Sequence, residues 1–203
     1  MADGCDGFEF DLRLTADGQA VVCHDPVWRD PKVGKIQIAQ ATAEQLSGLP
    51  RLCDVLVRYG NAFLDIELKV AGLESVVVEA VRDHPPERFV VSSFLPEVLE
   101  AVYAADANIP LGLICETRVQ LRRWKSLPVG YVIPNCLLVD QKLAREWKDA
   151  GKKVLVWTVN AAAEMRRLAG WGVDGMISDN PKRLAGTLAS RAGKDFGSTR
   201  PSP

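Results

Sequence analysis

Acidic residues recur at two-residue spacing in two segments that favour β-strand. In the first segment, Glu9 and Asp11 alternate with apolar neighbours. In the second segment, Asp65 and Glu67 do the same, and Lys69 follows them at the same spacing. Side chains two residues apart on a strand point to the same face of a sheet. If that face lines the interior of a curled sheet, the two acidic pairs share one cavity.

Carboxylates gathered in an apolar cavity need a compensating positive charge. Burial and mutual repulsion oppose their ionisation, on the order of several kcal/mol. Because the set holds oxygen donors and neither Cys nor His, Mg²⁺ or Ca²⁺ suits it better than zinc. We therefore expect one divalent cation, held by Glu9, Asp11 and Glu67. The alternative is a structural ion-pair network, in which the acids pair with Lys69, Arg13 and similar residues.

A histidine follows the first acidic segment. A short strand is expected over residues 19–23, and His24 comes at its end, followed by Asp25. Imidazole is suited to proton transfer at neutral pH, and a neighbouring carboxylate can orient its ring. The alternative is that a single loop histidine is structural, which is our interpretation of His84.

The segments that must position these residues alternate between two types. Short β-branched and aliphatic runs alternate with amphipathic segments, which is typical of repeated βα units and a parallel sheet. We predict strands over residues 8–12, 62–68, 89–92, 111–115, 131–133, 154–158 and 175–178. We predict helices over residues 52–59, 73–82, 96–105, 119–124, 141–150, 161–168 and 181–190, two of them with N-caps at Asp140 and Asn160. The fold expected is α/β, a TIM-type (β/α)8 barrel that is missing its first βα unit.

Length and composition limit the domain organisation and the partners. The 203 residues, 47% of them hydrophobic, fit one barrel domain over residues 1–190, followed by a disordered tail over residues 191–203 that is rich in Gly, Ser, Thr and Pro. A formal net charge of -1 provides no general basic field for nucleic acid. The expected uncovered edge of the sheet favours self-association into a homo-oligomer.

The cysteines and the hydropathy of the sequence indicate the cellular compartment of the protein. The five cysteines are widely spaced and form no CxxC pair, which favours reduced thiols. No apolar run approaches the length of a membrane span. We expect a cytoplasmic protein.

Seven short segments match, in order, the motifs of one known family. Residues 8–18 are similar to an E-x-D-v-x-x-T-x-D-G motif, residues 22–25 to v-x-H-D, and residues 66–69 to i-E-x-K. The remaining segments are residues 49–56, 91–94, 156–160 and 172–181, which match i-P-t-L-e-e-v-L, v-x-S-F, v-W-T-v-N and G-v-D-G-i-x-T-D-x-P. The chain thereby resembles the glycerophosphodiester phosphodiesterases.

The resemblance implies a role for individual residues. It assigns the divalent cation to Glu9, Asp11 and Glu67. It assigns catalysis to His24, as acid and base, and to Lys69, which would steady the phosphate. The residues expected to bind substrate are Arg13, Asp25 and Trp157, with the indole walling the alcohol-binding cleft.

The resemblance also implies an activity, which is metal-dependent hydrolysis of a small glycerophosphodiester to glycerol 3-phosphate and an alcohol. Members of the family begin with a strand ending in H-R-G and a P-E-N-T helix, and we expect both to be missing before Asp3. Two alternatives stay open. One is a catalytically impaired barrel remnant that binds metal or phosphoester without turnover, and the other is a related lipid-head-group phosphodiesterase.

Overall fold

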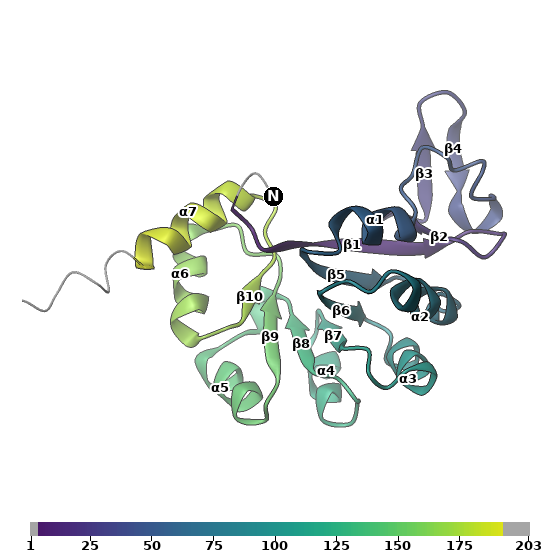
Figure 1. The fold of residues 1–203 in the computed structure, drawn as a ribbon. Coiled ribbons are helices and arrows are strands. Elements are labelled where there is room, and N and C mark those ends of the chain that lie inside the picture. Colours follow the sequence, from purple (N-terminus) through teal and green to yellow (C-terminus); the bar gives the residue numbers. More distant parts are fainter. Residues whose placement is uncertain (1–3, 193–203) are drawn as a thin grey trace, which may run out of the picture.

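A curled sheet with helices around its outer face forms the framework of the protein (Figure 1). The structure, a computed structural model, describes residues 4–192. The strands are β1 (Gly7–Leu14), β2 (Ala20–Val22), β3 (Val27–Asp30), β4 (Gly34–Gln37), β5 (Phe63–Leu68), β6 (Arg88–Ser93), β7 (Leu111–Cys115), β8 (Tyr131–Pro134), β9 (Lys153–Val156) and β10 (Gly175–Met176). The α-helices are α1 (Leu52–Tyr59), α2 (Glu74–Asp83), α3 (Pro96–Ala105), α4 (Arg118–Leu121), α5 (Gln141–Asp149), α6 (Ala162–Trp171) and α7 (Pro181–Ala192), and short 3-10 turns are η1 (Ile38–Gln40), η2 (Arg122–Lys125) and η3 (Cys136–Leu138).

The order of the strands confirms the predicted α/β, TIM-type topology. The 8-stranded sheet runs β10-β9-β8-β7-β6-β5-β1-β2, and each strand is parallel to its neighbour except β2, which is antiparallel to β1. Among residues 4–192, no ladder joins β10 to β1. The segment before β1 instead contacts α7, because Cys5 Sγ lies 3.7 Å from the carbonyl oxygen of Pro181. The curl thus brings the two ends of the sheet toward each other.

The pairing of β1 with β5 aligns the two acidic segments. Glu9 pairs with Asp65 and Asp11 pairs with Glu67 in this parallel ladder. The intervening apolar residues face outward into the main core, where Leu12 is 0% exposed under the helices. The side chains of β1 and β5 therefore alternate as predicted, with the acids on the inner face of the sheet and the apolar side chains on the outer face.

The close approach of β1 to β5 requires a glycine at its start. A Cβ at Gly7 would lie 1.9 Å from the carbonyl oxygen of Phe63, its partner in the ladder. No side chain fits at that distance, and the oxygen belongs to the backbone of a paired strand. The glycine therefore allows the register that places Glu9 beside Asp65.

A second apolar cluster fills the inside of the curl, separate from the main core under the helices. Its buried members are Val90, Ile114, Tyr131, Ile133 and Leu155, and its partly buried members are Phe63, Phe94, Trp157 and Ile177. Most of these residues come from β7 to β10 and the segments directly after them. The interior is therefore a packed core with an opening, as in other barrels of this type.

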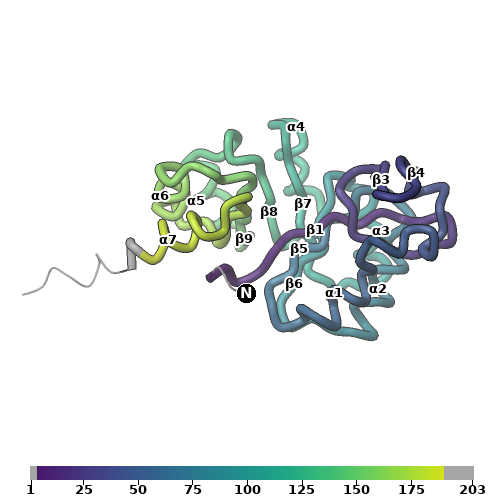
Figure 2. Tube along the Cα trace, turned by 90° about the horizontal axis from the view of Figure 1, so that it is seen from above, coloured from purple at the N-terminus to yellow at the C-terminus, as the bar shows by residue number. Residues whose placement is uncertain are grey.

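The β3–β4 hairpin and its apolar cluster were not predicted. Trp28 and Ile36 from the hairpin pack on a cluster formed by Val21, Ile38, Ala41 and Leu46. Viewed from above, the hairpin lies beside α1 to α3, on the side opposite α5 to α7 (Figure 2).

The helices follow the predicted boundaries closely, with two corrections. Asp140 caps α5 by accepting the main-chain N–H of Leu143 at 2.8 Å, as predicted. The expected cap at Asn160 is wrong, because α6 is preceded by Ala161 and the Asn160 side chain bonds elsewhere. Helix α7 continues to Ala192, two residues beyond the expected domain boundary, and the rest of the expected tail, residues 193–203, lies outside the described residues. None of the helices in the described range is long and apolar enough to cross a bilayer.

Candidate active site

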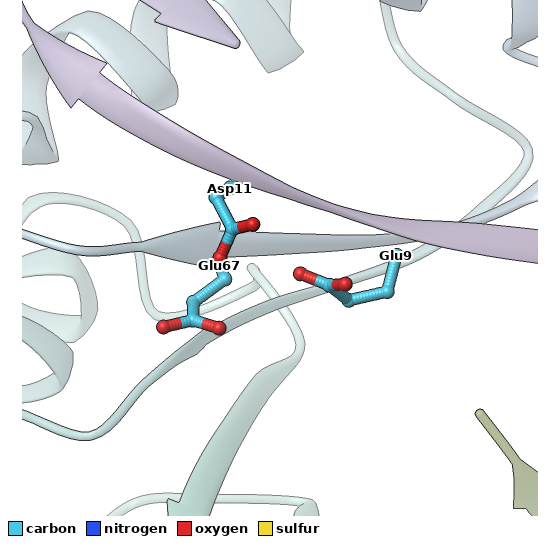
Figure 3. Close-up of side chains that lie close together, drawn as sticks. All are labelled: Glu9, Asp11 and Glu67. Atoms are coloured by element: carbon cyan, nitrogen blue, oxygen red, sulfur yellow. The ribbon is translucent and has the colours of Figure 1, made fainter. Parts of the chain in front are cut away.

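Three carboxylates converge at the inner face of the sheet (Figure 3). One oxygen each from Glu9, Asp11 and Glu67 lies within 4.8 Å of the other two. The first two side chains come from β1 and the third from β5, side by side in the ladder described above. The sequence-predicted cation ligands are thus brought together by the structure.

The positive charge at this cluster comes from Lys69. Its Nζ lies 3.0 Å from Asp11 Oδ1 and 2.8 Å from Glu67 Oε1. Although Lys69 lies close to Glu67 Oε1, this oxygen accepts no hydrogen bond of good geometry. Glu9 Oε1 is also buried and has no hydrogen-bond partner. Lys69 therefore compensates the cluster only in part, and the unsatisfied oxygens fit a hard cation with oxygen ligands. The alternative of an ion-pair network accounts for Asp11 and Glu67, which Lys69 contacts. It does not account for Glu9, and Arg13 contacts the His24 carbonyl oxygen instead of the acids.

Burial changes the protonation of these groups. It raises the pKa of Glu9 to about 8, helped by the negative charges of Asp11 and Asp65. It likewise raises the pKa of Asp65 to about 7, although a hydrogen bond from Ser92 acts in the opposite direction. The pKa of Glu67 is raised by burial as well, despite its contact with Lys69. An added positive charge would reverse these shifts, so the cluster favours binding a cation.

The carboxylates open into a cavity of about 470 Å³. One side is polar and is lined by Glu9, Asp11, His24, Asp65, Glu67 and Lys69. The other side is lined mainly by apolar residues, together with two acids at its rim: Ile114, Ile133, Trp157, Ile177, Glu116 and Asp179. Phe94 and Thr158 complete the wall. The cavity can therefore hold a small molecule with one charged end and one apolar surface.

His24 lines the cavity from the segment after β2. Its Nδ1 lies 2.8 Å from Asp25 Oδ1, and both side chains are 73% exposed. Arg13 shares the inner-facing spacing of Asp11 but turns to the backbone, since its Nε donates to the His24 carbonyl oxygen at 2.9 Å. Neither Arg13 nor Asp25 is among the residues that line the cavity. Both are thus placed to hold the His24 segment, and their direct binding of substrate stays a prediction.

Trp157 stands on the apolar side of the cavity. Its ring meets that of Phe94 edge to face, with the centroids 5.7 Å apart, and its Nε1 donates to the Ile133 carbonyl oxygen at 2.9 Å. The ammonium of Lys69 lies 5.7 Å from the centre of the Phe94 ring. The aromatic pair thus forms a wall of fixed orientation next to the charged side.

Several residues of the site were not assigned a role from the sequence, although Ser92, Asn160 and Asp179 lie in the segments that match the family motifs. Ser92 donates to Asp65 Oδ1 at 2.5 Å, and both side chains are buried. Asn160 donates to Asp179 Oδ2 at 2.7 Å and accepts the Asp179 main-chain N–H at 3.0 Å, which joins the segments after β9 and β10. The signal available for Glu116 and Asp179 was their place directly after a predicted strand, where the functional residues of such barrels gather.

Comparison with known proteins indicates the family. The family model described as the glycerophosphoryl diester phosphodiesterase family matches residues 1–84 and 56–183. A glycerophosphodiester phosphodiesterase from Caldanaerobacter subterraneus subsp. tengcongensis is 27% identical, over 91% of this chain and 86% of the relative. The crystal structure of a candidate glycerophosphoryl diester phosphodiesterase from Silicibacter pomeroyi matches with a TM-score of 0.85 and 25% identity, over 94% of this chain and 85% of that one.

A second solved structure carries a ligand. A phosphodiesterase from Oleispira antarctica, in complex with the product sn-glycerol-3-phosphate, matches with a TM-score of 0.82 over 93% of this chain and 87% of that one. Its sequence identity is 24%, so this likeness supports the fold.

Proposed function

The chain belongs to the glycerophosphoryl diester phosphodiesterase family, and on that premise we propose that it hydrolyses glycerophosphodiesters to glycerol 3-phosphate and an alcohol with a divalent cation. The observation that carries this proposal is the convergence of Glu9, Asp11 and Glu67 within 4.8 Å at the wall of a cavity. The reaction adds water across the bond between phosphorus and the alcohol oxygen, and the departing alcohol takes up a proton.

The residues of the polar side have separate tasks in this reaction. Lys69 brings a point charge to the cavity wall, where it can contact an oxygen of the anionic phosphodiester. His24 lies at the same wall with its Nδ1 engaged by Asp25, which leaves Nε2 to give or take a proton. The exposure of His24 allows it to exchange that proton with water between turnovers.

The cation ligands in this proposal are Glu9, Asp11 and Glu67. When bound, the cation would neutralise phosphate oxygens and act as a Lewis acid. The all-oxygen set favours Mg²⁺ or Ca²⁺ over zinc. Choosing between these two ions requires titration of the metal-free protein with each of them by calorimetry.

Replacing one ligand tests the proposed function. Glu67→Gln keeps the shape of the side chain and removes its charge, so we expect turnover of glycerophosphocholine to fall to background. We also expect cation affinity to fall at least about 100-fold, beyond the 10–100-fold typical of residues that merely support a ligand. Calorimetry gives the affinity, and an enzyme that oxidises glycerol 3-phosphate reports its release.

The control is His84→Ala, an exposed position at the end of α2 that lies away from the cavity. It should leave both quantities unchanged. Equal losses in the two variants would contradict the site. Tight cation binding without any turnover in the wild-type chain would contradict the proposed hydrolysis and favour a barrel that binds metal or phosphoester only.

Location and assembly extend the proposal. A cytoplasmic location is supported by the free thiols of Cys23, Cys53, Cys115 and Cys136. Self-association through a sheet edge stays a prediction, which light scattering over a range of protein concentrations would test.

A further inference from the structure

Charge is distributed unevenly between the two halves of the described chain. Residues 4–117 include eighteen acidic and nine basic residues, whereas residues 118–192 include six acidic and fourteen basic residues. Helices α1 to α3 of the first half and α5 to α7 of the second half lie on opposite sides of the molecule (Figure 2). The net charge of -1 thus conceals an acidic side and a basic side.

The basic residues of the second half are concentrated on α4, η2 and α5. All seven of those in these elements are exposed: Arg118, Arg122, Arg123, Lys125, Lys142, Arg145 and Lys148. The end of η2 and α5 lie side by side, because Lys125 Nζ is 2.8 Å from Glu146 Oε1. Within the described range 4–192, this is the one ion pair that any of the seven makes. We call the surface formed by these seven residues the basic face.

The acids among the basic residues neutralise little of their charge. Residues 118–149 contain three acids, which are Asp140, Glu146 and Asp149. Asp140 accepts the main-chain N–H of Leu143 as the cap of α5, and Glu146 is the partner of Lys125. An excess of positive charge therefore remains on the basic face, ready to meet an extended anionic surface.

Two exposed apolar side chains accompany the basic face. Val119 on α4 is 74% exposed, and Leu137 on η3, the turn that precedes α5, is 82% exposed. An apolar hollow of about 160 Å³ lies beside Val119. A nucleic acid offers phosphates to the cations but no apolar phase to these side chains. A bilayer of anionic lipids offers both, because charged head groups lie directly above acyl chains.

The basic face begins at the mouth of the cavity. Glu116, which lines the cavity, comes two residues before α4, and its main-chain N–H donates to Gln120 Oε1 at 3.0 Å. Phe94 lines both the cavity and the apolar hollow beside Val119. Strand β8, whose Ile133 also lines the cavity, leads directly to η3. A surface bound at the basic face would therefore lie next to the opening of the cavity.

We propose that the basic face, together with Val119 and Leu137, docks the protein reversibly on the surface of an anionic phospholipid bilayer. The basic side chains contact lipid phosphates, and the two apolar side chains enter the boundary between head groups and acyl chains. The acidic half of the molecule then faces away from the bilayer. This docking does not depend on whether the cavity hydrolyses its ligand, so it can be tested separately from the proposed function.

Sedimentation with vesicles measures the docking. The full chain is mixed with vesicles of phosphatidylglycerol and phosphatidylcholine in equal amounts, or of phosphatidylcholine alone. Chelator is present, so that no divalent cation links the carboxylates of the cavity to lipid phosphate. We expect binding to the anionic vesicles that is lost at high salt, and no binding to the neutral vesicles.

Two matched double variants locate the contact. Arg122→Gln combined with Arg145→Gln should weaken binding to the anionic vesicles about 30-fold, because each basic side chain at such a surface contributes a similar amount. The control combines Arg58→Gln with Arg88→Gln, which removes the same charge from exposed positions on α1 and β6. It should leave binding within about twofold of wild type. Equal losses in the two double variants would overturn the docking.

A third variant separates the bilayer from other anionic partners. Leu137→Ser, at an exposed position, should weaken binding to the anionic vesicles about fivefold. Unchanged binding would contradict entry of this side chain into the bilayer. Absence of vesicle binding by the wild-type chain would overturn the docking, and self-association at low salt would then assign the basic face to the acidic half of a second copy. An oligonucleotide that displaces the vesicles and binds Leu137→Ser as tightly as wild type would assign it to nucleic acid.

Discussion

The two sides of the cavity are built on equivalent parts of the fold and carry opposite kinds of residue. On the β1 and β5 side, the inner face presents Glu9, Asp11 and Glu67. On the β7 to β10 side, the inner face presents Ile114, Ile133 and Leu155. Both sets occupy inward positions of parallel strands in one sheet, so the backbone does not dictate the difference.

The two sides make opposite contributions to folding. Apolar side chains removed from water stabilise the fold by roughly 25 cal/mol for each Å² buried. Buried carboxylates destabilise it unless they are protonated or paired, as the raised pKa values of Glu9 and Asp65 indicate. Because the buried carboxylates on β1 and β5 do not stabilise the fold, their presence is best explained by a functional role. The comparison can be tested by changing each side and measuring stability and cation affinity together.

Truncation on the apolar side should have the largest effect on stability. Ile133 is 1% exposed, so Ile133→Ala is expected to lower the free energy of unfolding by about 2–5 kcal/mol. Cation affinity should stay within about twofold of wild type, because the substitution leaves β1 and β5 intact. Urea unfolding and calorimetry give the two values. Leu137→Ala, at a position 82% exposed, is the control and should change stability by less than about 0.5 kcal/mol.

If cation affinity fell in proportion to stability in Ile133→Ala, the two sides could not be treated as separate units. Loss of affinity in the control as well would indicate a general effect of handling or folding.

Titration on the acidic side should appear as a pH dependence of stability in the metal-free protein. The pKa of Glu9 rises from 4.5 in an unfolded chain to about 8 in the fold, and that of Asp65 rises from 3.8 to about 7. Between the unfolded and the native pKa of each group, the native state binds more protons than the unfolded state. The free energy of unfolding is therefore highest at low pH, where both acids are protonated, and it falls as pH rises to about 8. Thermal unfolding in chelator from pH 5 to pH 9 should show a falling midpoint.

Glu9→Gln should flatten this dependence, since it removes one of the titrating groups. A divalent cation should stabilise the wild-type protein more at pH 8 than at pH 5, where it must displace protons from its ligands. A wild-type midpoint independent of pH would contradict the assignment of buried, protonated acids.

The smallest effect is expected where the two sides meet. Trp157→Phe keeps an aromatic ring beside Phe94 and removes the hydrogen bond to the Ile133 carbonyl oxygen, at a cost of about 1 kcal/mol of stability. Cation affinity should be unchanged, and the KM for glycerophosphocholine should rise a few-fold. Steady-state kinetics and urea unfolding measure these changes, and Trp171→Phe on α6 is the matched control. A fall in cation affinity would show that Trp157 supports the acidic side rather than the substrate.

The acidic side could be predicted from the sequence because it repeats. Acids at two-residue spacing within apolar strands have one physical interpretation, an inner face with charge, and the register of β1 with β5 bears it out. Arg13 has the same spacing, yet its side chain turns to the His24 carbonyl oxygen, since a backbone acceptor lay within reach of its long side chain. Periodicity assigns a residue to a face, and the local contacts then decide where a flexible side chain ends.

The apolar side and the rim could not be predicted with the same ease. Glu116 and Asp179 are single acids after strands, with no repeat to distinguish them from surface residues. Asn160 precedes a helix and was expected to cap it, but hydrogen bonds to Asp179, distant in the sequence, replaced the local one. The β3–β4 hairpin was missed because its strands are short and its apolar side chains few. Pairings that depend on distant segments are not encoded in local patterns.

The position of Lys69 affects the arrangement of the carboxylates around it. Its ammonium lies between Asp11 and Glu67, so the two carboxylates are held near each other even when no other positive charge is nearby. In the proposed function, a divalent cation would find these ligands gathered, but it would compete with the Lys69 ammonium for two of them. Lys69 would thus lower the free-energy cost of holding Asp11 and Glu67 close together, and it would also limit how tightly the proposed cation binds. The same side chain would therefore keep two ligands in place for the proposed cation and reduce the affinity of the site for it.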